Sequence, residues 1–112
     1  MEVKIGNDKI NIELNFKRIS EIEKQVGSIY SLLEKVTNKE ISFSDVICFY
    51  YNGQSDASYS EEQLYKMIAK DGLTVHIGNV YNITLELLVG EETVSKITKE
   101  AEKEEADNLK KN

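Results

Sequence analysis

The spacing of apolar residues changes abruptly near residue 17. Over residues 2–16, apolar and polar residues alternate, which is typical of strands with one buried face, and Gly6-Asn7-Asp8 supplies a turn between two arms. From residue 17 onward, apolar residues recur every three or four positions, as on one face of a helix. An isolated hairpin is only marginally stable in water, so its apolar face must pack against the helices that follow. The residues expected on that face are Val3, Ile5, Ile10, Ile12, Leu14 and Phe16.

Two short helices are predicted after the hairpin, and they meet at Gly27. Ser20 is a candidate N-cap for the first helix, and Gly27 can end it in a left-handed conformation. Ser28 can cap the second helix. The apolar stripes that these helices would bury are Ile19, Ile22 and Val26 in the first, and Ile29, Leu32, Leu33 and Val36 in the second.

A third and a fourth helix are indicated by capping signals. Ser42 is followed three residues later by Asp45, as in a capping box, and the apolar run after it stops at Asn52-Gly53. The fourth helix opens with Ser60 to Gln63 and closes at Asp71-Gly72. The third helix is the most apolar segment of the chain, so it is the best candidate for the centre of the core.

Residues 73–89 fit two patterns. Their apolar residues alternate as in a strand, and Gly78-Asn79 could form the turn of a second hairpin. A helical face can also be drawn through Leu73, Ile77, Val80, Tyr81, Thr84 and Leu88. We expect a helix, because the hairpin would pair a very short arm with a long one.

The chain is therefore expected to form one α+β domain. A length of 112 residues suffices for a single modest core. Residues 1–90 would form the globular part, an N-terminal β-hairpin packed on a bundle of four to five short helices. Residues 91–112 offer almost nothing to bury, so a polar C-terminal tail is expected there, partly helical or disordered. The core is predicted to contain Leu14, Phe16, Ile22, Leu33, Ile47 and Leu64.

Charge and composition narrow the classes of partner. The net charge is −6 and no basic face stands out, so nucleic acid is not expected as a partner. No signal peptide and no apolar run long enough to span a bilayer are present, so a cytoplasmic protein without a membrane partner is expected. A single cysteine, Cys48, cannot form an internal disulfide, in agreement with a reducing compartment.

No residue pattern indicates catalysis, a cofactor or a metal site. His76 is the only histidine and has no cysteine or carboxylate at ligand spacing, so a structural role is expected for it. Cys48 lies among apolar residues and is expected to be a buried hydrophobic residue rather than a reactive thiol. The sequence therefore predicts a protein that is not an enzyme.

The chain has more tyrosines than a core of this size needs. Tyrosine is enriched at interfaces because it combines an apolar ring with a polar tip. A structural alternative stays open, in which several of these rings cover the edge of the core. The candidate partner-binding residues are Tyr50, Tyr51, Tyr59, Tyr65 and Tyr81.

The order of these segments resembles a known family. The pattern L-x-F-x-x-I-x-x-I-E-x-x-x-G-x-S-I-x-x-L-L over residues 14–33 is similar to the opening of the tail assembly chaperones of gene transfer agents and related prophages. The similarity continues through the apolar helix that ends at Gly53 and the Ser-Glu-Glu helix that ends at Asp71-Gly72. It covers about residues 3–90, and it implies a helix over residues 73–89.

By this resemblance, the chain would bind the tape measure protein of a tail in the bacterial host cytoplasm. It would keep that long polypeptide soluble, help to recruit tail tube subunits, and be absent from the mature particle. The resemblance leaves self-association open. A small regulatory or antitoxin-like protein-binding domain is the alternative from another class, and a structural tail tube protein is the less favoured alternative.

Overall fold

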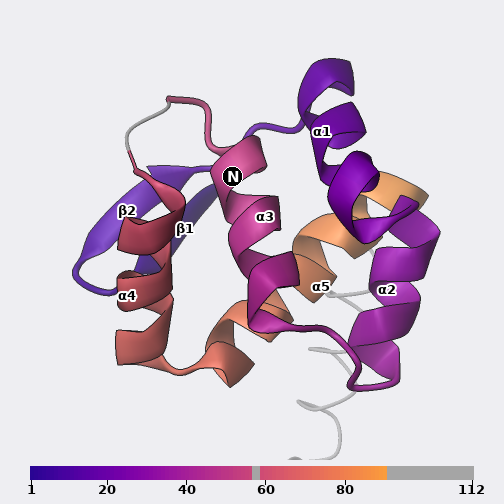
Figure 1. Ribbon diagram of the computed structural model, residues 1–112. Helices are drawn as coiled ribbons and strands as arrows, with labels where there is room; N and C mark the ends of the chain where they lie inside the picture. Colours follow the sequence, from indigo (N-terminus) through magenta and orange to yellow (C-terminus); the bar gives the residue numbers. More distant parts are fainter. Residues whose placement is uncertain (57–58, 91–112) are drawn as a thin grey trace, which may run out of the picture.

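The computed structural model of the protein describes residues 1–56 and 59–90 and has the predicted α+β architecture (Figure 1). The predicted polar segment 91–112 lies outside the described residues. Within the described part, a two-stranded antiparallel sheet precedes five helices. Their bounds are β1 (Glu2–Ile5), β2 (Asp8–Asn11), α1 (Phe16–Val26), α2 (Ile29–Thr37), α3 (Phe43–Gly53), α4 (Glu61–Asp71) and α5 (Leu73–Val89).

The N-terminal hairpin forms as predicted, but its second strand is shorter than the alternation suggested. Gly6 adopts the left-handed conformation that the turn requires, and Ile5 pairs with Asp8. β2 ends at Asn11, and Ile12 then makes an isolated bridge with Gln54 at the end of α3. The chain therefore leaves the hairpin by passing over α3 instead of continuing the strand.

The first helix starts earlier than predicted. The side chain of Asn15 accepts a hydrogen bond from the backbone N–H of Arg18 at 2.9 Å, so Asn15, and not Ser20, is the N-cap. Phe16 is thus the first residue of α1 and is 87% exposed, so its prediction as a core residue was wrong. The hydrogen bond between Arg18 and Asn15 starts the helix at Phe16, so the alternating pattern of a strand does not apply to Phe16.

The third, fourth and fifth helices agree with the sequence predictions. Ser42 and Ser60 both form complete capping boxes, with Asp45 and Gln63. Leu73–Val89 is a continuous helix, so the second hairpin does not form. In Figure 1, α3 runs through the middle of the molecule, with the hairpin and α4 on one side and α1 and α2 on the other; α3 packs against α1, α4 and α5.

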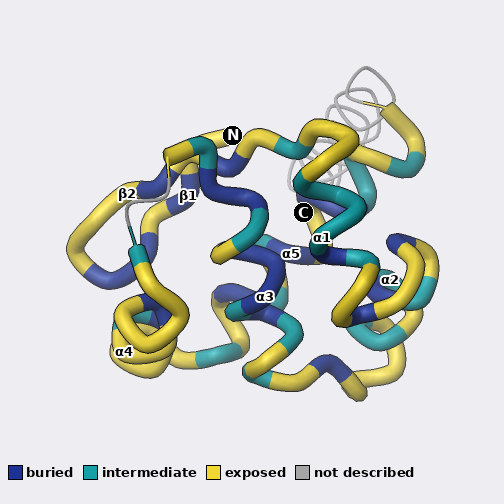
Figure 2. The backbone as a smooth tube through the Cα atoms, turned by 45° about the horizontal axis from the view of Figure 1, so that its top comes forward, coloured by how far each residue is buried: buried dark blue, intermediate teal, exposed yellow. Residues whose placement is uncertain are grey.

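The core lies around α3, where buried parts of the hairpin, α3 and α5 meet (Figure 2). Ile22 and Leu64 are fully buried, as predicted, and Cys48 is buried as expected. Leu14 and Ile47 pack against the edge of the core, while Leu33 is half-buried. The largest fully buried side chains are Tyr50, Phe49, Ile5, Ile22, Leu32, Leu64, Ile68 and His76.

Candidate functional site

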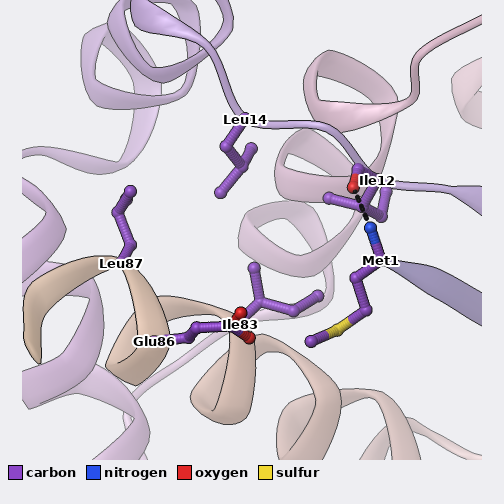
Figure 3. A pocket seen from close by; sticks show the side chains of 6 residues that line it. All are labelled: Met1, Ile12, Leu14, Ile83, Glu86 and Leu87. Carbon is purple, nitrogen blue, oxygen red and sulfur yellow. Dashed lines mark hydrogen bonds between the residues drawn. The ribbon is translucent and has the colours of Figure 1, made fainter. Parts of the chain in front are cut away.

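An apolar hollow of about 280 Å³ lies between the chain that leaves the hairpin and the C-terminal half of α5. In Figure 3, the side chains of Leu14, Ile83 and Leu87 point toward one another across it. Pockets for small molecules span roughly 300 to 1,000 Å³, so this hollow suits a few apolar side chains better than a large cofactor. Its lining residues are Met1, Ile12, Leu14, Ile83, Glu86 and Leu87.

The fold of the hairpin positions one wall of this hollow. The backbone N–H of Ile12 donates to the carbonyl of Met1 at 2.7 Å, and the amine of Met1 donates to the carbonyl of Ile12 at 2.7 Å. Gly53 lies directly beneath, and a Cβ atom there would come within 3.2 Å of Ile12 and 3.3 Å of Leu14. Because Gly53 has no side chain, Ile12 and Leu14 can pack closely against the end of α3.

A second hollow of about 410 Å³ adjoins the first. Met1 lines both hollows, and α5 forms a wall of each through Val75, Asn79, Ile83 and Leu87. These α5 residues are spaced four apart and share one helix face, which extends about 18 Å at 1.5 Å per residue. We refer to the two hollows together as the α5 trough. Beyond these residues, the second hollow is lined by Glu2, Val3, Lys4, Gly6 and Asp71.

The exposed side of α5 is unusually poor in charge. Among its 17 residues, Glu86 is the only one with an acidic or basic side chain other than the buried His76. Val75 is 57% exposed and Leu87 is 39% exposed, and both line the trough. A surface helix normally presents polar residues to water, so a helix with apolar residues on its solvent side is typical of an interaction surface.

A polar network lies at the N-terminal end of α5; it is buried at Tyr50 and His76 and reaches the surface at Asp71. The hydroxyl of Tyr50 is 2.8 Å from Nδ1 of His76, and Nε2 of His76 is 2.8 Å from Oδ2 of Asp71. The same oxygen of Asp71 accepts a hydrogen bond of 2.7 Å from the backbone N–H of Gly6. Asn79 donates to the Tyr50 hydroxyl at 3.2 Å. The network therefore joins the hairpin turn to α3, α4 and α5.

The electrostatics of this network favour a fixed direction of hydrogen bonding. The N–H of Gly6, and then the His76 side chain, lower the pKa of Asp71, so its ionised carboxylate only accepts hydrogen bonds. Nε2 of His76 must then donate to Asp71. In the neutral imidazole Nδ1 is an acceptor, so the Tyr50 hydroxyl donates to it. Burial raises the pKa of Tyr50 to about 12, which keeps that hydroxyl protonated as a donor.

Sequence reasoning did not foresee this network. His76 was expected to have a structural role, and no carboxylate was recognised near it, because Asp71 belongs to the preceding helix. The turn at Gly72 brings the two residues together. Since the Tyr50 hydroxyl, both ring nitrogens of His76 and Oδ2 of Asp71 all have partners inside the protein, we interpret the network as a clamp that holds the hairpin turn against the helices.

The candidate tyrosines do not form one surface. Tyr50 is fully buried, so the expectation that it contacts a partner at the surface was wrong; its ring fills the core and its hydroxyl belongs to the network. Tyr51, Tyr65 and Tyr81 are exposed on α3, α4 and α5, respectively. Tyr59 is half-buried and packs against the core.

Surroundings differ among the remaining tyrosines. Tyr65 packs against Phe43, with ring centroids 5.5 Å apart. Tyr51 and Tyr59 line two different hollows, one beside α1 and one beside β2. Tyr81 lies on α5 but does not line the trough. The structure therefore distributes these residues over the surface, whereas the two hollows of the α5 trough share Met1 and a wall formed by α5.

One sequence signal could have revealed the trough. Residues 73–89 fitted both a strand and a helix, and the reason is that α5 carries apolar residues on more than one face. One face packs on α2, α3 and α4, while Val75 and Leu87 remain exposed. An excess of apolar residues over what one buried helix face needs is itself a sign of a second contact surface.

Other reactive groups are not arranged as a site. Cys48 is buried, and burial raises the pKa of its thiol, which disfavours the reactive thiolate. Among residues 1–56 and 59–90, no three histidine, cysteine or acidic side chains gather in a geometry that could hold a metal ion. None of the helices that the structure describes has the length and apolar character needed to cross a membrane.

Comparison with known protein families, with curated proteins and with solved structures finds no match to this chain.

Proposed function

We propose that this protein is a tail assembly chaperone, which binds the tape measure protein in the bacterial cytoplasm while a phage or gene transfer agent tail is assembled. The residue pattern over 14–33 suggests this family. The observation that carries the proposal is the α5 trough, which has an apolar hollow at one end and runs beside a nearly uncharged helix on an otherwise charged surface.

The trough suits the task of a chaperone for a long helical polypeptide. An amphipathic helix binds by placing its apolar stripe in a hydrophobic groove, and a long chain offers many such stripes. Several copies of the protein could then bind one tape measure chain, each with modest affinity. The net charge of −6 would help to keep the resulting complex soluble.

The fold favours a chaperone over a structural tube subunit. Stacked rings of a tube require extensive sheets, whereas the described residues form one two-stranded sheet and are otherwise mainly helical. In this proposal, tail tube subunits are recruited to the complex, and the chaperone departs before the particle matures. Mass spectrometry of purified mature particles should therefore detect tube subunits and no copies of this chain.

Co-expression tests the proposal directly. The proposal predicts that a tape measure gene lies beside the gene for this chain, and the chain would be expressed with and without the product of that gene. We expect a larger soluble fraction of the tape measure protein in the presence of the chain, and a complex that survives gel filtration. Equal solubility in both cultures and no complex would contradict the proposal and favour the regulatory or antitoxin-like alternative, for which a toxin encoded next to the gene is the partner to test.

The tyrosines can be tested in the same experiment. Tyr51 and Tyr59 lie outside the α5 trough and line two different hollows, so each reports on a separate contact surface. If they contribute, Tyr51→Ala and Tyr59→Ala will lower the amount of co-purified tape measure protein while circular dichroism stays unchanged. If the trough alone binds, the Tyr51 variant will capture as much as the unmodified chain.

A further inference from the structure

We infer that the α5 trough binds a helix of the partner polypeptide, and that this helix carries an apolar stripe together with a lysine or arginine that pairs with Glu86. The inference rests on the proposed function and extends it by naming the binding face and the chemistry of the segment that occupies it.

The shape of the trough indicates an elongated occupant. Its α5 wall presents Val75, Asn79, Ile83 and Leu87 at successive intervals of four residues. A wall of about 18 Å corresponds to about 12 residues of a bound helix lying alongside it. Side chains spaced three and four apart on that helix would enter the two hollows in turn. The apolar stripe belongs at the end lined by Leu14, Ile83 and Leu87.

The charges of the trough select a basic occupant. The acidic side chains Glu2, Asp71 and Glu86 outnumber the two cations of the trough, which are Lys4 and the amine of Met1. Glu2 pairs with Lys9 at 3.3 Å, and Asp71 binds Gly6 and His76 within the protein.

Glu86 is different from these two acids. It makes no ion pair within the part of the chain that the structure describes, and it is the only charged side chain among the six residues of the apolar hollow. A partner cation at this position would meet a carboxylate at the edge of an apolar surface, where the attraction is weakened less by water than on an open surface.

The same charges disfavour a second copy of this chain as the occupant. A two-fold symmetric contact centred on the apolar hollow would bring Glu86 of one copy toward Glu86 of the other. Like charges placed close together at an interface are unfavourable. A separate polypeptide with a basic residue avoids this repulsion.

Two substitutions in the full-length chain test the inference, each with a matched control. Leu87→Asp places a charge in the apolar hollow, and Tyr30→Asp makes the same charge change at an exposed aromatic residue of α2. Glu86→Lys reverses the charge in the trough, and Glu34→Lys reverses an exposed charge of α2. Circular dichroism and thermal melts would establish that all four variants are folded.

Binding would be measured by fluorescence anisotropy with overlapping synthetic peptides that span the tape measure protein encoded by the neighbouring gene. We expect Leu87→Asp to weaken binding of the best peptide by at least about tenfold, because it places a charge in the apolar hollow that holds the peptide's apolar stripe. Glu86→Lys should weaken it by about threefold, and this loss should shrink at roughly 0.5 M salt, where exposed charges are screened. The two α2 controls should bind as the unmodified chain does.

The decisive comparison reverses both charges of the proposed pair, Glu86 and the basic residue of the peptide. A peptide whose basic residue is replaced by glutamate should bind the Glu86→Lys variant more tightly than it binds the unmodified chain. Tight peptide binding that is unchanged in Leu87→Asp and Glu86→Lys would overturn the inference and leave the proposed function standing. No binding of any peptide, together with no gain in solubility on co-expression, would overturn both.

Two other occupants give distinct results. If a second copy fills the trough, the chain alone will self-associate in sedimentation experiments, Leu87→Asp will abolish this association, and the inference fails. If residues 91–112 of the same chain fill it, peptide binding will appear only after Val94→Asp and Ile97→Asp are introduced, which also contradicts the inference.

Discussion

Nε2 of His76 lies 2.8 Å from Oδ2 of Asp71, and the same oxygen atom receives the backbone N–H of Gly6 at 2.7 Å. One carboxylate therefore connects the first turn of α5 to the turn of the hairpin. The Tyr50 hydroxyl extends the connection to α3 at the centre of the core. This arrangement stabilises the position of the hairpin, which also supplies one wall of the α5 trough.

Removing the Tyr50 hydroxyl should destabilise the protein. Tyr50→Phe keeps the ring in the core but removes the donor to Nδ1 of His76 and the acceptor of the Asn79 amide, which then keep only their mutual contact of 3.4 Å. A lost hydrogen bond costs about 0.5–1.5 kcal/mol and an unpaired buried polar group about 1–3 kcal/mol, so the free energy of unfolding should fall by about 1–2 kcal/mol. Urea denaturation would measure the change. Tyr51→Phe, at the exposed neighbouring position, should leave the value within about 0.5 kcal/mol.

The Asp71 interactions predict a specific dependence on pH. The pKa of Asp71 is lowered in the folded protein, chiefly by the Gly6 N–H and next by His76. Its contribution to stability is therefore present above its unfolded pKa of about 3.9 and is lost as the pH falls through the folded pKa. Asp71→Asn should be less stable than the unmodified chain at neutral pH. This difference in stability should become smaller below about pH 4.

Thermal melts across this pH range would check the Asp71 prediction. Asp56→Asn, which changes an exposed carboxylate outside the network, should show no such narrowing. A gap between Asp71→Asn and the unmodified chain that stays constant down to low pH would show that ionisation of Asp71 is not what stabilises the fold.

Two glycines in helices should respond differently to alanine. Gly78 lies inside α5, and a Cβ atom there would meet nothing within 4 Å, so Gly78→Ala should raise the free energy of unfolding by about 0.5–1 kcal/mol. At Gly53 the same atom would come within 3.2 Å of Ile12 and 3.3 Å of Leu14. Gly53→Ala should therefore bring no gain and should weaken peptide binding in the trough. Equal stabilisation by both would argue against the close packing at Gly53.

The position of Phe16 can be tested against that of Ile22 on the same helix. Phe16 is almost fully exposed, whereas Ile22 is fully buried. Phe16→Ser should change the free energy of unfolding by no more than about 0.5 kcal/mol. Ile22→Ala should cost about 2–5 kcal/mol, because it removes buried apolar atoms and leaves a cavity. Comparable losses in the two variants would mean that Phe16 packs in the core after all.

Local signals predicted the elements of the fold because each depends on residues close together in the sequence. The turn at Gly6 and the capping boxes at Ser42 and Ser60 form between residues at most a few positions apart. The start of α1 was missed although its signal is also local. Asn15 is a good N-cap, but the alternation that runs on to Phe16 suggested a continuing strand.

Burial of individual side chains was harder to predict, because it depends on which elements meet. Tyr50 and Tyr51 are neighbours with the same chemistry, yet the first is fully buried and the second is exposed. Their difference in exposure follows from the orientation of α3, which directs Tyr50 into the core and Tyr51 toward solvent. A surface assignment for all the tyrosines was therefore wrong for the one that faces the core.

By itself, the sequence determined an N-terminal hairpin, a set of capped amphipathic helices and a charged, acidic surface, since these follow from the spacing and chemistry of nearby residues. Only the tertiary structure decided that Asp71, His76 and Tyr50 share one network, and that Leu14 faces Leu87 across a hollow. Tyr50 is distant along the chain from Asp71 and His76, as Leu14 is from Leu87. Both arrangements depend on the angles at which helices pack, which local patterns do not specify.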